Sequence, residues 1–323
     1  MRARKVLTMV AWIAASVGII GGGWASGQTP NNEQCSLAVV TRTVHHDTPV
    51  CDLPTVQRLA RNGHAFEQNQ LGIASMLVIG PDFNEKEALA WFELAARRGY
   101  AAAEVNLAVM YVNGWGTTVN YPAALHWLNV AADQQFGRAY YNLGILYLEG
   151  KGVRQDNDEA FRWFQRGAEA GDSSAQTNVG YMYDMGLGRP RDVATAAKWY
   201  RKAAEAENAL GENNLADLYL RGEGVKQDDS TAFTWFQKAA EQGHTGARIK
   251  LGYMYAEGRG TAKNPEAGYA WIKAAQMAGD PRGNEMLLGL EKMLSADQVA
   301  EAREQATRLQ EAQGALSARS FAQ

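Results

Sequence analysis

The chain has 323 residues, of which 46% are hydrophobic, 10% aromatic and 21% charged. This composition excludes a low-complexity disordered chain, because it contains enough aromatic residues to form a buried core. With 32 basic and 35 acidic residues the formal net charge is -3, which argues against a nucleic-acid-binding protein, since such proteins need a basic surface.

The N-terminal segment, residues 1–27, has the pattern of a secretory signal peptide. Its positive charges are Arg2, Arg4 and Lys5, and an apolar run over residues 6–20 follows them. Because this run is short for a bilayer span, we predict cleavage after the small residues that end at position 27. The mature protein is then expected to be periplasmic or secreted. The alternative is an uncleaved segment that anchors the chain in the inner membrane.

Residues 28–64 form the predicted head of the mature protein. They contain both cysteines of the chain, Cys35 and Cys51, and export to an oxidising compartment favours a disulfide between them. This disulfide would close a loop of about 15 residues and contribute roughly 3 kcal/mol. Because His45 and His46 lie in the same loop, a zinc site is the alternative, but the spacing matches no common zinc motif.

A repeat of 36 residues dominates the rest of the chain. It is carried by tryptophans at Trp91, Trp127, Trp163, Trp199, Trp235 and Trp271, and by aliphatic residues at Leu71, Leu107, Leu143, Val179, Leu215 and Leu251. Glycines recur at the same spacing. Residues 65–280 therefore divide into six units: 65–100, 101–136, 137–172, 173–208, 209–244 and 245–280. We predict an all-α fold, a right-handed α-solenoid of six helix-turn-helix repeats with a capping helix at each end.

Each unit is predicted to form two helices. In the first helix, apolar residues recur on one face at i, i+4, i+7 and i+8, as at Ala139, Leu143, Leu146 and Tyr147. Gly144 follows the core leucine, and its missing side chain would let the neighbouring helix approach closely. A Gly-x-Gly pair then ends the helix, because glycine readily adopts the left-handed conformation.

The second helix has a clear start. An Asn or Asp lies seven residues before each tryptophan and is predicted to be the N-cap of the second helix. Each N-cap stabilises the helix by ~1 kcal/mol. The six residues are Asn84, Asn120, Asp156, Asp192, Asp228 and Asn264. Glu87 and Glu159 are expected to complete capping boxes. The repeated tryptophans are expected to be core residues, since they keep one helical phase. Trp115, which lies between two loop glycines, is expected to be exposed.

Segments 139–153 and 156–171 resemble a Sel1-like repeat, a relative of the tetratricopeptide repeat with a longer turn between its helices. The resemblance extends over residues 65–280 and is weakest in the first unit, where Ser75 and Val78 replace tyrosine and glycine. It implies a tetratricopeptide-like helical fold.

The flanking segments are predicted to be caps, because a terminal repeat otherwise exposes its stacking face. Residues 54–63 would form half a repeat that covers the first unit. In the C-terminal segment, 281–323, one helix is followed by a second that starts at Ser295, and residues 312–323 are expected to fray.

No catalytic motif accompanies the repeats: H-E-x-x-H, Walker and nucleophile-elbow patterns are missing from the sequence. Cysteine-rich secreted members of the family have been linked to β-lactam hydrolysis, so the resemblance makes a cell-wall or β-lactam hydrolase the alternative function. Those members carry a cysteine pair in each unit, whereas the six units here contain none. We therefore predict a protein without catalytic residues, cofactor or metal.

The predicted function is that of an exported scaffold for protein–protein interaction, without nucleic acid or stable membrane insertion. Helix-pair solenoids present their first helices on a concave face, where a peptide or protein partner could bind. The candidate residues flank the core leucine off the packing stripe: Asn106, Tyr141, Asn142, Asn178, Tyr181, Asn213, Asn214, Asp217 and Tyr253.

These candidates have different expected roles. The resemblance implies that the asparagines hold the backbone of a bound peptide; the alternative is that they bridge neighbouring repeats, since buried amides must be satisfied either way. Tyr181 and Tyr253 are the expected aromatic anchors and lie two repeats apart. Asp217, in the same phase between them, would favour a partner with a basic group.

Overall fold

The computed structural model describes residues 36–37, 50–77 and 84–322, with the backbone alone at 36–37, 50–51, 77 and 313–322. The described residues contain fifteen α-helices, which confirms the all-α prediction. The predicted signal segment, Cys35, and the histidines of the alternative zinc site lie outside the described residues. Signal cleavage, the disulfide and the zinc alternative therefore stay predictions.

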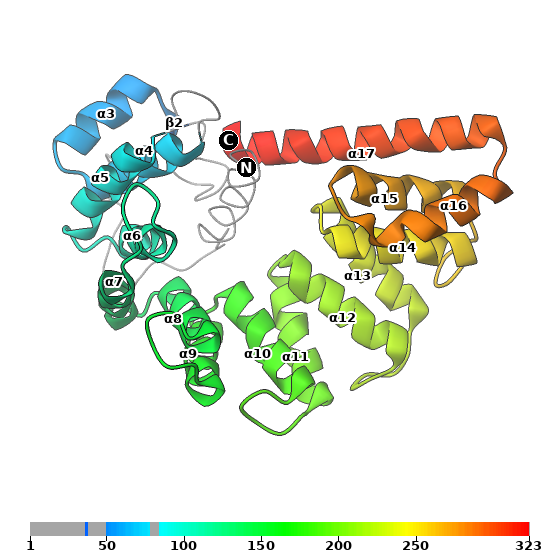
Figure 1. Ribbon diagram of the computed structural model, residues 1–323, viewed down its shortest axis with the longest axis horizontal. Coiled ribbons are helices and arrows are strands. Elements are labelled where there is room, and N and C mark those ends of the chain that lie inside the picture. Colours follow the sequence, from blue (N-terminus) through cyan, green and yellow to red (C-terminus); the bar gives the residue numbers. More distant parts are fainter. Residues whose placement is uncertain (1–35, 38–49, 78–83, 323) are drawn as a thin grey trace. The chain divides into compact units, whose positions relative to one another are not determined.

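Each repeat consists of two helices, as predicted. The first helices are α4 (Ala65–Leu77), α6 (Ala101–Asn113), α8 (Gly137–Glu149), α10 (Ser173–Met185), α12 (Ala209–Arg221) and α14 (Thr245–Glu257). The second helices are α5 (Glu85–Ala96), α7 (Tyr121–Asp133), α9 (Asn157–Glu169), α11 (Val193–Glu205), α13 (Asp229–Glu241) and α15 (Pro265–Met277). Consecutive helices pack side by side from α4 to α9 and again from α11 to α15 (Figure 1).

Extra elements flank the repeats at both ends. Helix α3 (Leu53–Arg61) packs on α4 as the predicted half-repeat, and a short parallel sheet pairs β1 (Ser36–Leu37) with β2 (Val50–Cys51). At the other end, a 3-10 turn, η1 (Pro281–Gly283), leads into α16 (Asn284–Met293) and α17 (Ala296–Ala322). Ser295 and Gln298 form the reciprocal cap that starts α17. The helix continues to Ala322, although fraying was expected from residue 312.

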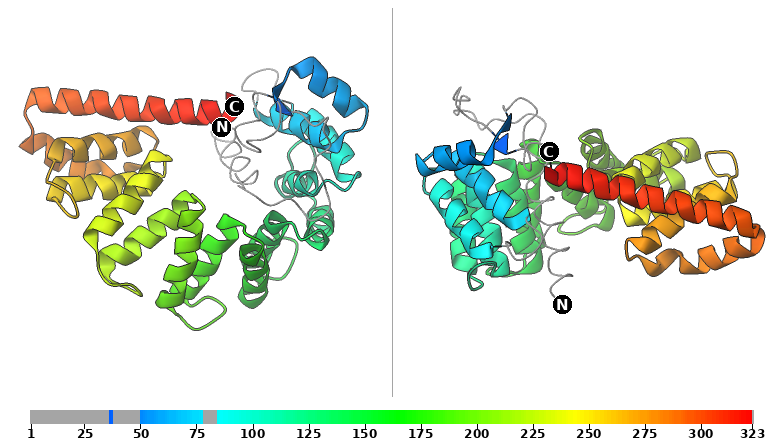
Figure 2. Two further views of the ribbon diagram at one scale, coloured as in Figure 1. Left: turned by 180° about the vertical axis from the view of Figure 1, so that it is seen from behind. Right: turned by 90° about the horizontal axis from the view of Figure 1, so that it is seen from above.

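The chain divides into two compact units: residues up to 175 with those from 318, and residues 176–317. Within each unit the core is a series of local clusters, each built from two to four successive helices. Within each unit, the helix pairs follow one another in sequence order (Figure 2, left). This arrangement is that of a helical-repeat protein, in which each repeat contacts only its neighbours.

The two helices of a repeat meet at a small residue. A Cβ atom added to Gly144 would lie 2.6 Å from the Phe164 ring, and one added to Gly180 would lie 2.6 Å from the Tyr200 ring. The same position is filled by Gly72, Ala108, Ala216 and Gly252 in the other repeats. The prediction that glycine here permits close helix approach is thus confirmed.

The repeated tryptophans are half-buried, which corrects the expectation that they form the core. The fully buried position is the next residue in every repeat: Phe92, Leu128, Phe164, Tyr200, Phe236 and Ile272. Successive residues of a helix are rotated by about 100°, so only one of the two can face the small residue of the first helix. Trp163 instead stacks on Tyr140 at a ring distance of 6.0 Å, and the Arg166 guanidinium lies 4.9 Å from its ring.

Trp115 is also half-buried, so the expectation that it is exposed was wrong. Its ring packs against the clusters of both the first and the second repeat. The reason lies in the turn after α6, where the Trp115 N–H donates to the Met110 carbonyl and folds the loop back on its helix. A glycine-flanked position was therefore compatible with packing.

All six predicted N-caps are confirmed, but the capping boxes are not. The Asp156 carboxylate accepts from the Glu159 N–H, at 3.0 Å, as expected. The Glu159 carboxylate, however, accepts from Arg162 instead of returning to the cap. It is not needed there, because the Asp156 N–H already donates to the Tyr147 carbonyl of the preceding helix. The same backbone bond recurs at the N-caps of α7, α11, α13 and α15.

We expect Gly252→Ala to destabilise the protein by about 1–3 kcal/mol, although alanine favours helix more than glycine does. The added Cβ would lie 2.5 Å from Ile272 and 2.7 Å from the Gly268 carbonyl oxygen, and the backbone there cannot move without shifting α15. Urea unfolding measures the effect. Gly289→Ala is the matched control, because open space surrounds that helical glycine and a gain of about 0.5–1 kcal/mol is expected. Equal effects of the two substitutions would contradict the close-contact interpretation.

Candidate partner-binding site

Helices α10, α12 and α14 are neighbours in the second unit and carry most of the predicted binding residues. The Thr177 hydroxyl on α10 donates to Asn208, the N-cap of α12, at 3.1 Å. The Lys250 ammonium on α14 donates to the Asn213 side chain on α12 at 3.2 Å. Helices α10, α12 and α14 therefore lie next to one another in this order.

Tyr181 and Tyr253 point away from the core. Each is followed by a methionine that is fully buried, so the tyrosine itself must face outward. Tyr181 is 41% exposed and Tyr253 38% exposed, which is high for large aromatic side chains. We name the surface formed by Tyr181, Asn214, Asp217, Lys250 and Tyr253 the tyrosine face.

An ion pair occupies the centre of the tyrosine face. The Lys250 ammonium donates a very short hydrogen bond to the Asp217 carboxylate, and the two side chains are 35% and 27% exposed. The expectation that Asp217 offers a free negative charge to a basic partner is therefore corrected. The sequence reasoning missed Lys250, although its place one repeat after Asn214 could have been read from the 36-residue spacing.

The asparagines on and beside the tyrosine face serve contacts within the protein. Asn213 is buried, accepts from Lys250 and donates to the Asn214 side chain at 3.0 Å. Asn214 in turn bonds the Tyr200 hydroxyl, whose pKa burial raises. Asn178 precedes Val179 on α10 and is half-buried. These contacts support the bridging alternative for Asn213 and Asn214, while leaving the tyrosines accessible.

The predicted residues of the first unit are also engaged internally. Asn106 donates to Asn69 of the preceding repeat at 2.9 Å, and Asn142 is buried and donates to the Arg138 carbonyl. The Tyr141 ring lies 5.1 Å from the Arg138 guanidinium, which forms a buried ion pair with Asp172 at 2.9 Å. Burial raises the pKa of Tyr141. These residues stay a predicted site, but they expose less side chain than Tyr181 and Tyr253.

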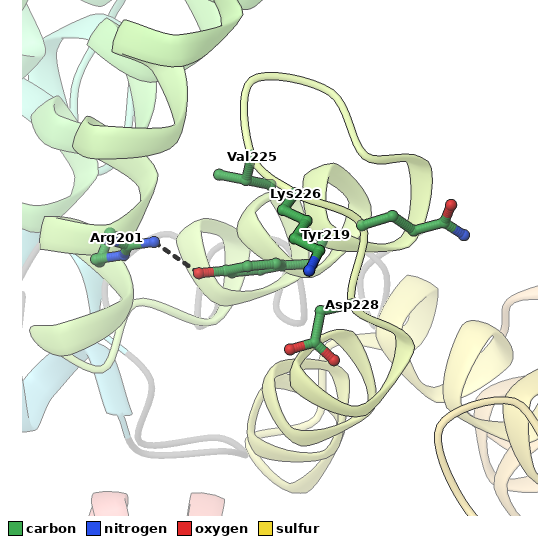
Figure 3. A pocket seen from close by; sticks show the side chains of 6 residues that line it. Arg201, Tyr219, Val225, Lys226 and Asp228 are labelled. Carbon is green, nitrogen blue, oxygen red and sulfur yellow. Dashed lines mark hydrogen bonds between the residues drawn. The ribbon is translucent and has the colours of Figure 1, made fainter.

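A pocket of about 420 Å3 lies away from the tyrosine face, beside the turn between α12 and α13. It is lined by Arg201, Tyr219, Val225, Lys226, Gln227 and Asp228 (Figure 3). The Arg201 guanidinium donates to the Tyr219 hydroxyl at 2.6 Å, and the Asp228 carboxylate caps α13. Arg201, Tyr219 and Asp228 thus already have structural partners.

Two buried carboxyl groups have strongly raised pKa values and are therefore the strongest candidates for acid–base chemistry. Burial raises the pKa of both Glu104 and Glu212 to about 7 from the usual 4.5. Each accepts a hydrogen bond from a glutamine at the end of the second helix in its own repeat, Gln134 or Gln242. Raised pKa values of carboxyl groups often mark active sites. Here, however, Glu104 and Glu212 occupy equivalent positions in separate repeats, and each is bound by one glutamine. This pattern indicates a structural role for both residues.

Within the described residues, no cluster of three or more His, Cys, Asp or Glu side chains is arranged to hold a metal ion. Among the helices of that same part of the chain, none combines the length and apolar character of a membrane span.

Comparison with known families identifies the repeats. The family described as Sel1 repeat matches residues 69–100, 101–136, 137–172, 173–208, 209–244 and 246–280. These ranges agree with the units predicted from the 36-residue spacing. No curated protein matches the chain.

Solved structures with a similar fold include Sel1 repeat proteins. The chain is similar to a Sel1 repeat protein from Oxalobacter formigenes, with 29% identity and a TM-score of 0.63 over 70% of this chain and 100% of that one. A protective antigen of uropathogenic Escherichia coli is 25% identical, with a TM-score of 0.48 over 82% of this chain and 64% of that one. An immunity protein from Pseudomonas aeruginosa is 16% identical, with a TM-score of 0.46 over 81% and 84%. Of these three structures, only the Oxalobacter formigenes protein has a TM-score above 0.5.

Glu212→Gln should stabilise the protein at pH 8 by roughly 1–3 kcal/mol and have little effect at pH 4. The folded state holds the Glu212 proton more tightly than the unfolded state, so this group loses its stabilising contribution as pH rises from about 4.5 to about 7. Urea unfolding across this range measures the difference. The same change at exposed Glu257, which solvent surrounds, serves as control. A pH-independent effect of Glu212→Gln would contradict the assignment.

Proposed function

The chain belongs to the Sel1 repeat family, and from this premise we propose that it is an exported interaction scaffold whose tyrosine face binds an extended segment of a partner protein. The observation that carries the proposal is the exposure of Tyr181 and Tyr253 at the same repeat position on α10 and α14. Tyrosine offers a large contact area with little loss of side-chain entropy, which makes it an effective anchor in binding sites.

The spacing of the two tyrosines fits an extended peptide. Packed helices lie about 8–10 Å apart, so first helices two repeats apart place the rings roughly 20 Å from each other. An extended chain rises about 3.3 Å per residue, and about six residues would span this distance. A side chain of the partner would contact each ring, with the peptide backbone crossing α12 between them.

The chemistry between the tyrosines favours recognition of peptide backbone over recognition of a charged side chain. Asp217 and Lys250 neutralise each other, so neither supplies a free charge. Their partly exposed polar atoms can still exchange hydrogen bonds with the N–H and C=O groups of a peptide. We therefore expect affinity to depend on apolar or aromatic residues of the partner and only weakly on its net charge.

Export rests on the N-terminal sequence. A positive start, an apolar run and small residues at the end of 1–27 are the features of a cleaved signal. An oxidising destination would allow Cys35 and Cys51 to pair and close the loop between them within the head of the mature chain.

The combined substitution Tyr181→Ala and Tyr253→Ala should weaken peptide binding about tenfold or more, the loss typical of aromatic anchors. Random linear peptides selected on the immobilised wild-type protein serve as probes, and titration calorimetry of an enriched peptide measures the loss. Because both rings lie outside the core, helix content and melting temperature should stay near those of the wild type.

The matched control is Leu94→Ala with Met277→Ala, two changes of similarly exposed apolar residues on second helices. These changes should leave binding intact. If the control abolishes binding while the tyrosine variant binds normally, the site lies on the second helices and the tyrosine face is wrong.

Export is tested by expression in a Gram-negative bacterium. The wild-type chain should reach the periplasm with a mass that lacks residues 1–27 and without reactive thiols after unfolding in the absence of reductant. Ile13→Arg, a charge in the apolar run, should keep the full-length chain in the cytoplasm with two reactive thiols. A full-length wild-type protein in the membrane fraction would favour the anchor alternative.

A further inference from the structure

Helix α16 takes the place of the first helix of a seventh repeat. Leu287 and Leu290 lie 36 residues after Leu251 and Met254, and all four are buried. Gly283 follows Ala247 at the same spacing and packs directly against Ile272 of the preceding second helix. The inner face of α16 therefore continues the stack that the six repeats form.

Among the residues that the structure describes, no second helix covers the outer face of α16 as α15 covers α14. Where the other repeats have glycine or alanine, α16 has Leu288, which is 61% exposed. A second helix cannot approach at this position as closely as α15 approaches α14 at Gly252.

Helix α17 takes a different course. Its Arg303 side chain donates to Tyr269 of α15 and Glu291 of α16, and its Gln310 accepts from Arg248 of α14 at 3.0 Å. Ala302 and Ala306 are its fully buried positions. Helix α17 is thus held by the last repeat and leaves the outer face of α16 open.

The open face carries a short stripe suited to helix–helix contact. Glu285, Leu288, Gly289 and Lys292 are all exposed and follow the i, i+3, i+4, i+7 spacing of one helix side. A Cβ on Gly289 would meet no atom within 4 Å, so another helix could approach closely there. We name these four residues the outer ridge of α16.

The outer ridge is complementary to itself in the antiparallel direction. If two copies of α16 cross about a two-fold axis between residues 288 and 289, Glu285 of each copy faces Lys292 of the other. Leu288 of each copy then packs on Gly289 of the other beside the axis, where the missing side chain gives room for the contact. Two-fold symmetric pairs of this kind require only one self-complementary patch.

We propose that the outer ridge of α16 binds the outer ridge of a second copy of this chain, forming a two-fold symmetric dimer. Charge complementarity selects this occupant, because a self-pair matches two acidic with two basic groups around an apolar centre. Four residues on one helix bury much less surface than a stable dimer needs, so the association is weak, with a Kd of about 10 µM to 1 mM.

Sedimentation equilibrium over a range of protein concentrations tests the proposal through a charge exchange. Lys292→Glu places two acidic groups opposite each other, and Glu285→Lys places two basic groups opposite each other. Each variant alone should dimerise about tenfold more weakly than the wild type. An equimolar mixture of the two variants should recover association, because every facing pair in the mixed dimer has opposite charges.

Circular dichroism should show the same helix content in all three proteins, since both residues are exposed. A wild-type chain that stays monomeric up to about 1 mM would overturn the proposal. So would single variants that dimerise as the wild type does, or a mixture that associates no better than its components, since either result would place the contact elsewhere.

Discussion

The contact between a small residue on each first helix and a large side chain on the second helix determines the geometry of every repeat. At Gly144 and Gly180 the aromatic rings of Phe164 and Tyr200 fill the space that a Cβ would take. The helix backbones can therefore approach closely, and dispersion contacts are made along their whole length. Where the small residue is replaced, at Leu288, the second helix does not pair in the same way and the series of repeats ends.

This contact also decides which side chains face outward. Because a helix turns by about 100° per residue, seating Phe164 in the contact moves Trp163 to the edge of the interface. In the first helices, burial of Met182 and Met254 directs the preceding tyrosines to the surface. The tyrosine face is therefore a consequence of core packing repeated at a fixed spacing.

Polar groups at the ends of the second helices are satisfied by one repeated position of the following first helix. The side chains of Gln68, Tyr140 and Arg248 donate to carbonyl oxygens in the last turn of the preceding helix, those of Ala60, Ala132 and Ala240. Helix ends leave such carbonyls without internal partners. An ionised glutamate cannot donate, and where Glu104 and Glu212 occupy this position their pKa is raised and a glutamine side chain binds them.

The sequence by itself determined the period, the two helices of each repeat, the N-caps and the end caps. These features depend on local rules: helical periodicity, the capping preference of Asn and Asp, and the conformational freedom of glycine. These local patterns recur in every repeat, so a single unusual residue does not obscure them. The N-cap at Asn84 was recognised even in the first unit, whose sequence departs from the repeat pattern at Ser75 and Val78.

Only the tertiary structure decided which of two adjacent apolar residues is buried, and which polar side chains remain available. Trp163 and Phe164 are both aromatic, and their burial depends on the angle at which the neighbouring helix lies. Trp115 was misjudged because a loop can fold back onto two clusters at once. Asp217 was expected to be free, but its partner Lys250 is 33 residues away in the sequence and becomes a neighbour only when α12 and α14 stack. Long-range contacts of this kind arise from packing and leave no local pattern. The signal for this one was the 36-residue period, which places Lys250 one repeat after Asn214.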